Sequence, residues 1–315
     1  MVNVFTSLTS SIRARDLVEP LGPPLSASMS FEDAEDVLFS ACVEAGFAYD
    51  IGDRVSLVFE DDRVVGWYTV DMREGNVGCV RDACSQIYPS EIVAGDTSAF
   101  KLVHLMASRP RSGIVLFVLD EDAIVGTVSP FVFHAPLFRI CLFSLTLELE
   151  TAALNAALVN PLASWNALSE GRRAKAQEVF GHFAGESRRP MSSDQPPIGD
   201  LLSATTFADK GKIIAKRQLL ANRKRGDVES LFAKAERIRN WCAHTRYSKY
   251  QSPLGGLAAD IASFIEECLQ ASVELANQAM KTDAKRRRGL SSSSWSSPYE
   301  PGSRADRPLH HGIYI

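Results

Sequence analysis

The sequence contains an internal repeat, and this repeat limits the folds open to its first half more than any other feature. Residues 17–72 and 80–135 each show the pattern of a helix followed by two β-rich runs. A glycine stands in the last run of each unit, and these two glycines, Gly66 and Gly126, lie 60 residues apart. A unit this small cannot bury its apolar face alone, so we expect the two to pack together as one domain.

The first unit is predicted to begin with a capped helix. Ser30 is a good N-cap residue, and Asp33 stands at the third helical position. Two strands are expected at 55–59 and 64–70, joined by a charged turn. The apolar residues of the helix recur at spacings of three and four, and they are Ala34, Val37, Leu38, Ala41, Cys42 and Ala45.

The second unit repeats this plan. Thr97 or Ser98 is expected to cap its helix. Strands are predicted at 114–119 and 123–129. The apolar face of this helix is formed by Ala99, Leu102, Val103 and Met106.

The two units together resemble a tandem pair of CBS domains over roughly residues 15–135. The resemblance is carried by SFEDAEDVL with SLVFEDDRVVGWYTVDM, and by TSAFKLVHLM with IVLFVLDEDAIVGTVSPFVF. Such pairs commonly bind adenine nucleotides or S-adenosylmethionine between the units, through a Gly-x-x-Ser/Thr-x-x-Asp pattern. The resemblance implies that Thr69 and Ser129 contact such a ligand.

The acidic position departs from that pattern in both units. In the first unit the acid is Asp71, one position early, and in the second unit Val132 replaces it. Thr69, Asp71 and Ser129 are therefore the candidate nucleotide-binding residues, with an adenine nucleotide as an effector rather than a required cofactor. The alternative is a rigid, dimerising interaction module that binds no nucleotide.

From Leu137 onward the apolar pattern becomes helical and predicts an all-α bundle. The boundaries expected from this change are residues 1–135 for the regulatory domain, 136–283 for the bundle and 284–315 for a disordered tail. The fold class is thus α+β followed by all-α. Helices are predicted at 137–158, 168–183, 199–207, 211–221, from Asp227 onward, and from 257 onward.

One stretch of the bundle, AERIRNWCAHTRY, holds Arg239, Asn240 and His244. Together with LFSLTLELETAALNAAL and GDLLSATTFADKGKIIAK, this stretch resembles a HEPN domain. Many HEPN proteins are metal-independent RNases that act as dimers, with one Arg-x-x-x-x-His motif from each subunit. The resemblance implies that His244 is the general acid/base, that Arg239 stabilises charge on the phosphate, and that Asn240 orients the imidazole.

A purely structural role for the same residues is the alternative. On a straight helix Arg239 and His244 diverge by about 140°, and Arg239 lies beside the apolar stripe. In that case Arg239 pairs with a buried glutamate such as Glu148, and His244 caps a helix C-terminus.

A group of basic residues between residues 210 and 225 is a candidate phosphate-facing patch, or alternatively a solvated helix face. Its main members are Lys212, Lys216, Arg217 and Arg223.

The net charge and the spacing of the cysteines limit the binding partners and metal sites that can be expected. The net charge of −4 excludes a bulk polyanion binder, and DNA is not an expected partner. The six cysteines show no C-x-x-C pair, so no metal site is predicted. Because the sequence shows no signal peptide and no apolar run long enough to span a membrane, a cytoplasmic protein is expected. The resemblance to HEPN domains implies a homodimer. The predicted function is an RNA endonuclease gated by nucleotide sensing; the alternative is a non-catalytic sensor or scaffold.

Overall fold

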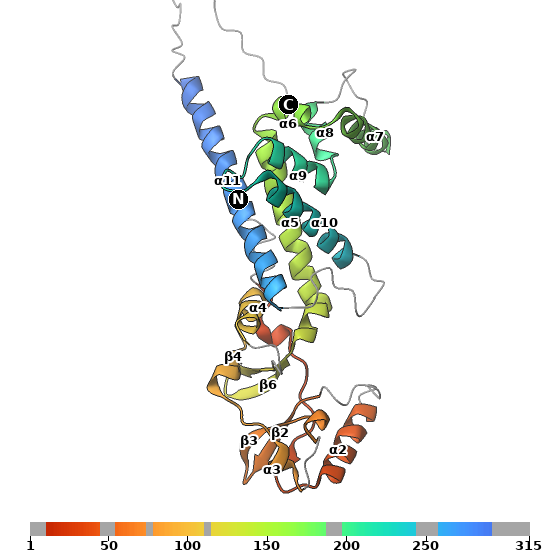
Figure 1. The fold of residues 1–315 in the computed structure, drawn as a ribbon, viewed down its shortest axis with the longest axis vertical. Coiled ribbons are helices and arrows are strands. Elements are labelled where there is room, and N and C mark those ends of the chain that lie inside the picture. Colours follow the sequence, from red (N-terminus) through yellow and green to blue (C-terminus); the bar gives the residue numbers. More distant parts are fainter. Residues whose placement is uncertain are drawn as a thin grey trace, which may run out of the picture.

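The structure is a computed structural model that describes residues 11–44, 54–73, 78–109, 115–186, 197–243 and 258–291. An N-terminal half with small sheets leads into a helical C-terminal region, which confirms the predicted fold class (Figure 1). Within these residues, no helix has both the length and the apolar character that crossing a membrane requires.

The first sheet unit contains β1 (Leu25–Ser26), α2 (Phe31–Glu44), β2 (Ser56–Glu60) and β3 (Arg63–Tyr68). The sheet order is β1-β2-β3, with β1 parallel and β3 antiparallel to β2. The predicted N-cap of α2 is confirmed, because the Ser30 hydroxyl accepts from the Asp33 N–H at 3.1 Å and donates to its carboxylate at 2.6 Å. β1 was not predicted, because two residues are too few to show an alternating pattern.

The second sheet unit contains β4 (Ile92–Ala94), α4 (Ala99–Ala107), β5 (Leu116–Asp120) and β6 (Ala123–Val128). Its order is β4-β5-β6, with the same strand directions as in the first unit. Ser98 is the cap of α4, since its hydroxyl accepts from the Lys101 N–H. The hairpin irregularities also repeat: one falls between Val58 and Phe59 and the other between Val118 and Leu119.

The segment that precedes each sheet unit runs across the other sheet unit and forms hydrogen bonds with it. Glu19, which precedes β1, exchanges backbone hydrogen bonds with Thr127 of β6 at 2.7 and 3.0 Å. Ser85, which precedes β4, does the same with Trp67 of β3 at 2.8 and 2.9 Å.

These crossing segments explain why a glycine occurs at the equivalent position of each unit. A Cβ atom on Gly66 would lie 2.4 Å from the Ser85 carbonyl oxygen, and one on Gly126 would lie 2.7 Å from the Glu19 carbonyl oxygen. Only a residue without a side chain lets the crossing segment approach so closely.

Short helical segments connect these parts, and longer helices build the C-terminal region. The connecting segments are η1 (Ala14–Asp16), η2 (Val70–Arg73), α3 (Val80–Ala83), η3 (Pro89–Glu91) and η4 (Pro130–His134). The C-terminal region contains α5 (Pro136–Leu158), α6 (Pro161–Ala167), α7 (Glu170–Glu186), α8 (Ile198–Ser203), α9 (Phe207–Lys216), α10 (Arg225–Ala243) and α11 (Ala258–Ser291).

Several predicted boundaries in the helical region were wrong. The helix expected at 199–207 is α8, which ends at Ser203, and the helix expected from Asp227 onward is α10, which begins at Arg225. The helix expected at 211–221 is α9, which begins earlier because Thr206 and Asp209 form a capping box. It ends at Lys216, just before Gln218 adopts a positive φ of 51°. Residues 284–291, which were expected to belong to the tail, are part of α11, because this helix continues to Ser291. The rest of the predicted tail, residues 292–315, lies outside the described residues.

The division between hydrophobic cores does not coincide with the change from sheets to helices at residue 135. The first sheet unit has a core of its own around Phe31, Val58 and Tyr68. The second unit shares one continuous core with the bundle, in which Met106 of α4 belongs with Phe264 of α11. A smaller cluster around Leu57 and Phe117 joins the two sheet units, as expected for repeats that pack as one domain.

Candidate functional site

Helix α10 carries the described part of the Arg-Asn-x-x-x-His motif. Its inner face follows the predicted stripe, with Val228, Leu231, Phe232, Ala235 and Ile238 all buried. Helical periodicity then sets Arg239 at the margin of the stripe and turns Asn240 to the exposed surface.

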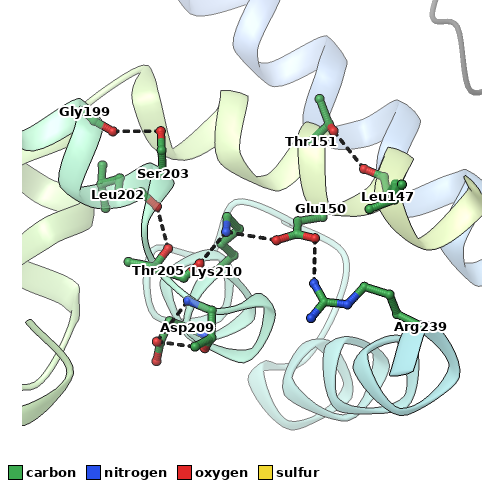
Figure 2. Close-up of polar contacts among 11 residues, drawn as sticks. Leu147, Glu150, Thr151, Gly199, Leu202, Ser203, Thr205, Asp209, Lys210 and Arg239 are labelled. Atoms are coloured by element: carbon green, nitrogen blue, oxygen red, sulfur yellow. Dashed lines mark hydrogen bonds and ion pairs between the residues drawn. The ribbon is translucent and has the colours of Figure 1, made fainter. Parts of the chain in front are cut away.

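Arg239 is bound to the neighbouring helices through a carboxylate. Its Nη1 lies 2.9 Å from Oε2 of Glu150 on α5, and its guanidinium carbon lies 5.5 Å from the centre of the Phe207 ring. Lys210 of α9 reaches the other oxygen of Glu150 at 3.0 Å and donates to the Thr205 carbonyl at 2.6 Å (Figure 2). The expected glutamate pairing is therefore present, with Glu150 in place of Glu148.

The two cations of this network differ in their access to solvent. The side chain of Lys210 is 4% exposed, whereas those of Glu150 and Arg239 are 20% and 28% exposed. Two positive groups share one carboxylate, so Glu150 keeps a counterion when Arg239 moves away. A guanidinium carries five N–H donors, so the contact with Glu150 does not exhaust its capacity to bind an anion.

The C-terminal end of α10 is held from the start of α5. Nη2 of Arg139 donates to the carbonyl oxygens of Trp241 and Cys242 at 2.5 and 3.2 Å. Its guanidinium carbon also lies 4.7 Å from the centre of the Trp241 ring. The last carbonyls of a helix lack partners within the helix and carry the negative end of its dipole, so a cation is favoured here.

Burial at this end of α10 shifts the pKa values of two side chains, those of Cys242 and His134. Burial raises the pKa of the Cys242 thiol to about 12, against a smaller opposing effect of Arg139. His134 of η4 faces the Trp241 ring edge-on, with the ring centres 6.2 Å apart. Burial, and then the charge of Arg139, lower the pKa of His134 below its ordinary value.

His244, the third motif residue, lies outside the described residues. In sequence it follows Ala243, the last residue of α10. The two described motif residues have different surroundings: Arg239 is engaged inside the bundle, and Asn240 is exposed.

The candidate nucleotide-binding residues do not share one environment. Thr69 is buried, and Asp71 is exposed on η2. Ser129 donates to the Glu19 carboxylate, 3.1 Å from each oxygen, and accepts from the Phe131 N–H. A carboxylate therefore does lie beside Ser129, supplied by the crossing segment. Sequence reasoning missed Glu19, since no local pattern connects it with a residue 110 positions away.

The basic residues near α9 contact different neighbours. Lys216 donates to the Ala167 carbonyl at 2.6 Å, and Arg217 donates to the Ser164 hydroxyl at 2.5 Å. Burial lowers the pKa of Arg217. Arg223 instead reaches α11, where its Nη2 lies 3.2 Å from Oε1 of Gln270. Lys212 is half-buried, while two of the other residues contact α6 and one contacts α11, as well as carrying positive charge.

No family model matches the chain, and no curated protein matches it. Among the residues that the structure describes, no group of three or more His, Cys, Asp and Glu side chains gathers as a metal site would require.

Proposed function

We propose that this chain is a metal-independent RNA endonuclease of the HEPN type, controlled by its N-terminal sheet units. The observation that carries the proposal is the exposure of Asn240 near the end of α10, a helix end whose carbonyls are held by Arg139. His244 stands four residues after Asn240 in the sequence, and this spacing is the one that brings two side chains together on the face of a helix.

In the proposed reaction His244 removes the proton from a ribose 2′-hydroxyl. The 2′-oxygen attacks the adjacent phosphorus, and the bond from phosphorus to the 5′-oxygen breaks. The products are a 2′,3′-cyclic phosphate and a 5′-hydroxyl end. His244 of a second copy supplies the proton to the leaving oxygen, and Asn240 orients the imidazole.

Arg239 stabilises the charge that develops on the phosphate oxygens in this proposal. The network around Glu150 supports the role, since Lys210 lies 3.0 Å from Glu150 and can serve as its counterion when Arg239 turns toward a phosphate. Breaking the contact with Arg239 therefore leaves no buried carboxylate without a cation.

The test is RNA cleavage by the purified chain in the presence of EDTA, with the product ends identified by mass spectrometry. Cyclic phosphate ends are expected, His244→Ala should abolish cleavage, and Asn240→Ala should lower the rate. His182→Ala is the matched control, because His182 is exposed on α7, outside the motif. Full cleavage by His244→Ala would rule out the assignment.

A second function, a non-catalytic scaffold, is favoured by the same ion-pair network. Glu150, Lys210 and Arg239 connect α5, α9 and α10, as expected for residues that stabilise a bundle. A scaffold cleaves no RNA, and Arg239→Ala should then change only the melting temperature. Cleavage by the wild-type chain decides between the two functions.

The control of activity by an adenine nucleotide is proposed from the second sheet unit. The Glu19 carboxylate beside Ser129 is a group that can hold ribose hydroxyls. ATP, AMP and S-adenosylmethionine are the ligands to test by thermal shift, and a ligand at a hundred times its Kd should add about 2.7 kcal/mol of stability. If none of the three shifts the melting temperature, the sheet units are better described as an interaction module.

A further inference from the structure

A pocket of about 230 Å³ lies at the C-terminal end of α5. Its walls are supplied by this end of α5, by the segment that follows α9, and by α11, which packs beside α5 (Figure 1). Part of the lining is apolar and consists of Ala156, Val159, Leu219 and Ala279. None of the lining residues belongs to α10, so the pocket is separate from the Arg-Asn-x-x-x-His motif.

Arg217 brings a positive charge to this pocket. Its Nη1 donates to the Ser164 hydroxyl at 2.5 Å, which uses one of the five N–H donors of the guanidinium. Within the described part of the chain, Arg217 forms no ion pair with a carboxylate. Burial lowers the pKa of Arg217 because it withdraws the charge partly from water. A partly buried charge without a counterion is unfavourable, so a bound anion would stabilise it.

The carbonyl groups at the end of α5 are bound by Ser164 and not by Arg217. Ser164 is fully buried, and its hydroxyl lies 2.7 Å from the Ala157 carbonyl oxygen and 3.0 Å from the Asn160 carbonyl oxygen. The remaining N–H donors of Arg217 are therefore left for a ligand.

Two side-chain amides add donors to the same pocket. Oδ1 of Asn160 accepts from the Ala163 N–H at 3.1 Å, and among the described residues its NH₂ group has no hydrogen-bond partner. The side-chain amide of Gln278 on α11 likewise has none within that part of the chain. Three groups that donate N–H bonds, one of them charged, match an anion that accepts several hydrogen bonds.

The apolar lining and the volume indicate an organic anion. A carbon framework can cover the apolar side chains, whereas a hydrated inorganic ion would leave them in contact with water. A cavity of about 150 Å³ accommodates benzene. In proportion, about 230 Å³ accommodates roughly nine non-hydrogen atoms.

We propose that this pocket binds a small organic carboxylate of roughly nine non-hydrogen atoms, with its carboxylate on Arg217 and its carbon framework against the apolar lining. A carboxylate and a guanidinium form two parallel N–H···O bonds, and Asn160 and Gln278 donate to the same carboxylate. The site is independent of the proposed nuclease function.

Benzoate is a probe of the required size and charge, and isothermal titration calorimetry measures its binding to the full chain. Benzamide is a neutral counterpart of equal size, and inorganic phosphate is an anion without a carbon framework. We expect a Kd of about 1 mM or lower for benzoate. Benzamide and phosphate should each bind at least about tenfold more weakly.

Arg217→Met should weaken benzoate binding about 10- to 100-fold, because it removes charge-assisted hydrogen bonds. Lys216→Met is the matched control, since it removes a neighbouring exposed cation outside the pocket, and its affinity should stay within about twofold of the wild type. Ala279→Leu fills the pocket without changing a charge and should also weaken binding at least about tenfold. This variant keeps the test decisive if Arg217→Met fails to fold.

A wild-type chain that does not bind benzoate would overturn the proposal, as would equal affinities for benzoate and benzamide. Unchanged benzoate binding by a folded Arg217→Met or by Ala279→Leu would do the same. Phosphate binding as tight as that of benzoate would show that the pocket does not select an organic anion.

Discussion

Replacing Lys210 with methionine should destabilise the bundle much more than the same change at Arg239, although both residues bind Glu150. Lys210 is 4% exposed, and it donates to Glu150 at 3.0 Å and to the Thr205 carbonyl at 2.6 Å. Its removal takes a donor from a buried carbonyl and a cation from a partly buried carboxylate. Breaking such buried pairs costs about 3–5 kcal/mol, and we expect about 3 kcal/mol because Arg239 still neutralises Glu150.

Arg239 is 28% exposed, so solvent screens its contact with Glu150, and Lys210 remains as a counterion. We therefore expect Arg239→Met to cost about 1 kcal/mol. At about 2–4 °C per kcal/mol, the melting temperature should fall by about 6–12 °C for Lys210→Met and by about 2–4 °C for Arg239→Met.

Urea unfolding followed by circular dichroism measures both free energies. Lys212→Met is the matched control on α9, and this half-buried residue should change stability by no more than about 0.5 kcal/mol. The double variant should lose more than the sum of the single losses, because Glu150 then has neither cation. An Arg239→Met loss equal to that of Lys210→Met, or strictly additive losses, would refute the shared-counterion reasoning.

Three further outcomes are expected. Gly126→Ala should lower stability by about 1–3 kcal/mol in urea unfolding, because its Cβ would meet the Glu19 carbonyl at 2.7 Å, whereas Gly226→Ala, with no atom within 4 Å, should not. The pKa of His134 is lower in the folded chain than in the unfolded chain. As the pH drops below 6.5, the unfolded chain therefore takes up a proton at His134 more readily than the folded chain, and the free energy of unfolding should fall. His134→Gln should flatten that slope in unfolding measurements from pH 7 to pH 5. The pKa of Cys242 is about 12, so its thiol should resist iodoacetamide at pH 8 in the folded chain and react in urea, as peptide mass spectrometry can show.

Structural features that depend on a short stretch of sequence could be predicted. The caps at Ser30 and Ser98 follow from local side-chain chemistry, and α5 begins and ends within a residue of its predicted bounds. The paired glycines were found from their spacing alone, although the reason for them, the crossing segments at Glu19 and Ser85, emerged only from the fold.

Structural features that depend on contacts between residues far apart in the chain could not be predicted from the sequence. Helix α5 is apolar on nearly all sides, so its sequence does not say which of its glutamates faces Arg239, and the structure selects Glu150. Arg139 gave no local signal at all, because its partners Trp241 and Cys242 are about a hundred residues away.

The core shared by the second sheet unit and the bundle has a consequence for the evolution of such a chain. A regulatory region joined by a linker can be exchanged by recombination, since the cut exposes little apolar surface. A cut at residue 135 here would separate Met106 from Phe264 and leave apolar surface on both pieces. We therefore expect the second sheet unit to stay with the bundle, while the first unit has a core of its own around Tyr68 and is joined to the second through the cluster around Leu57 and Phe117.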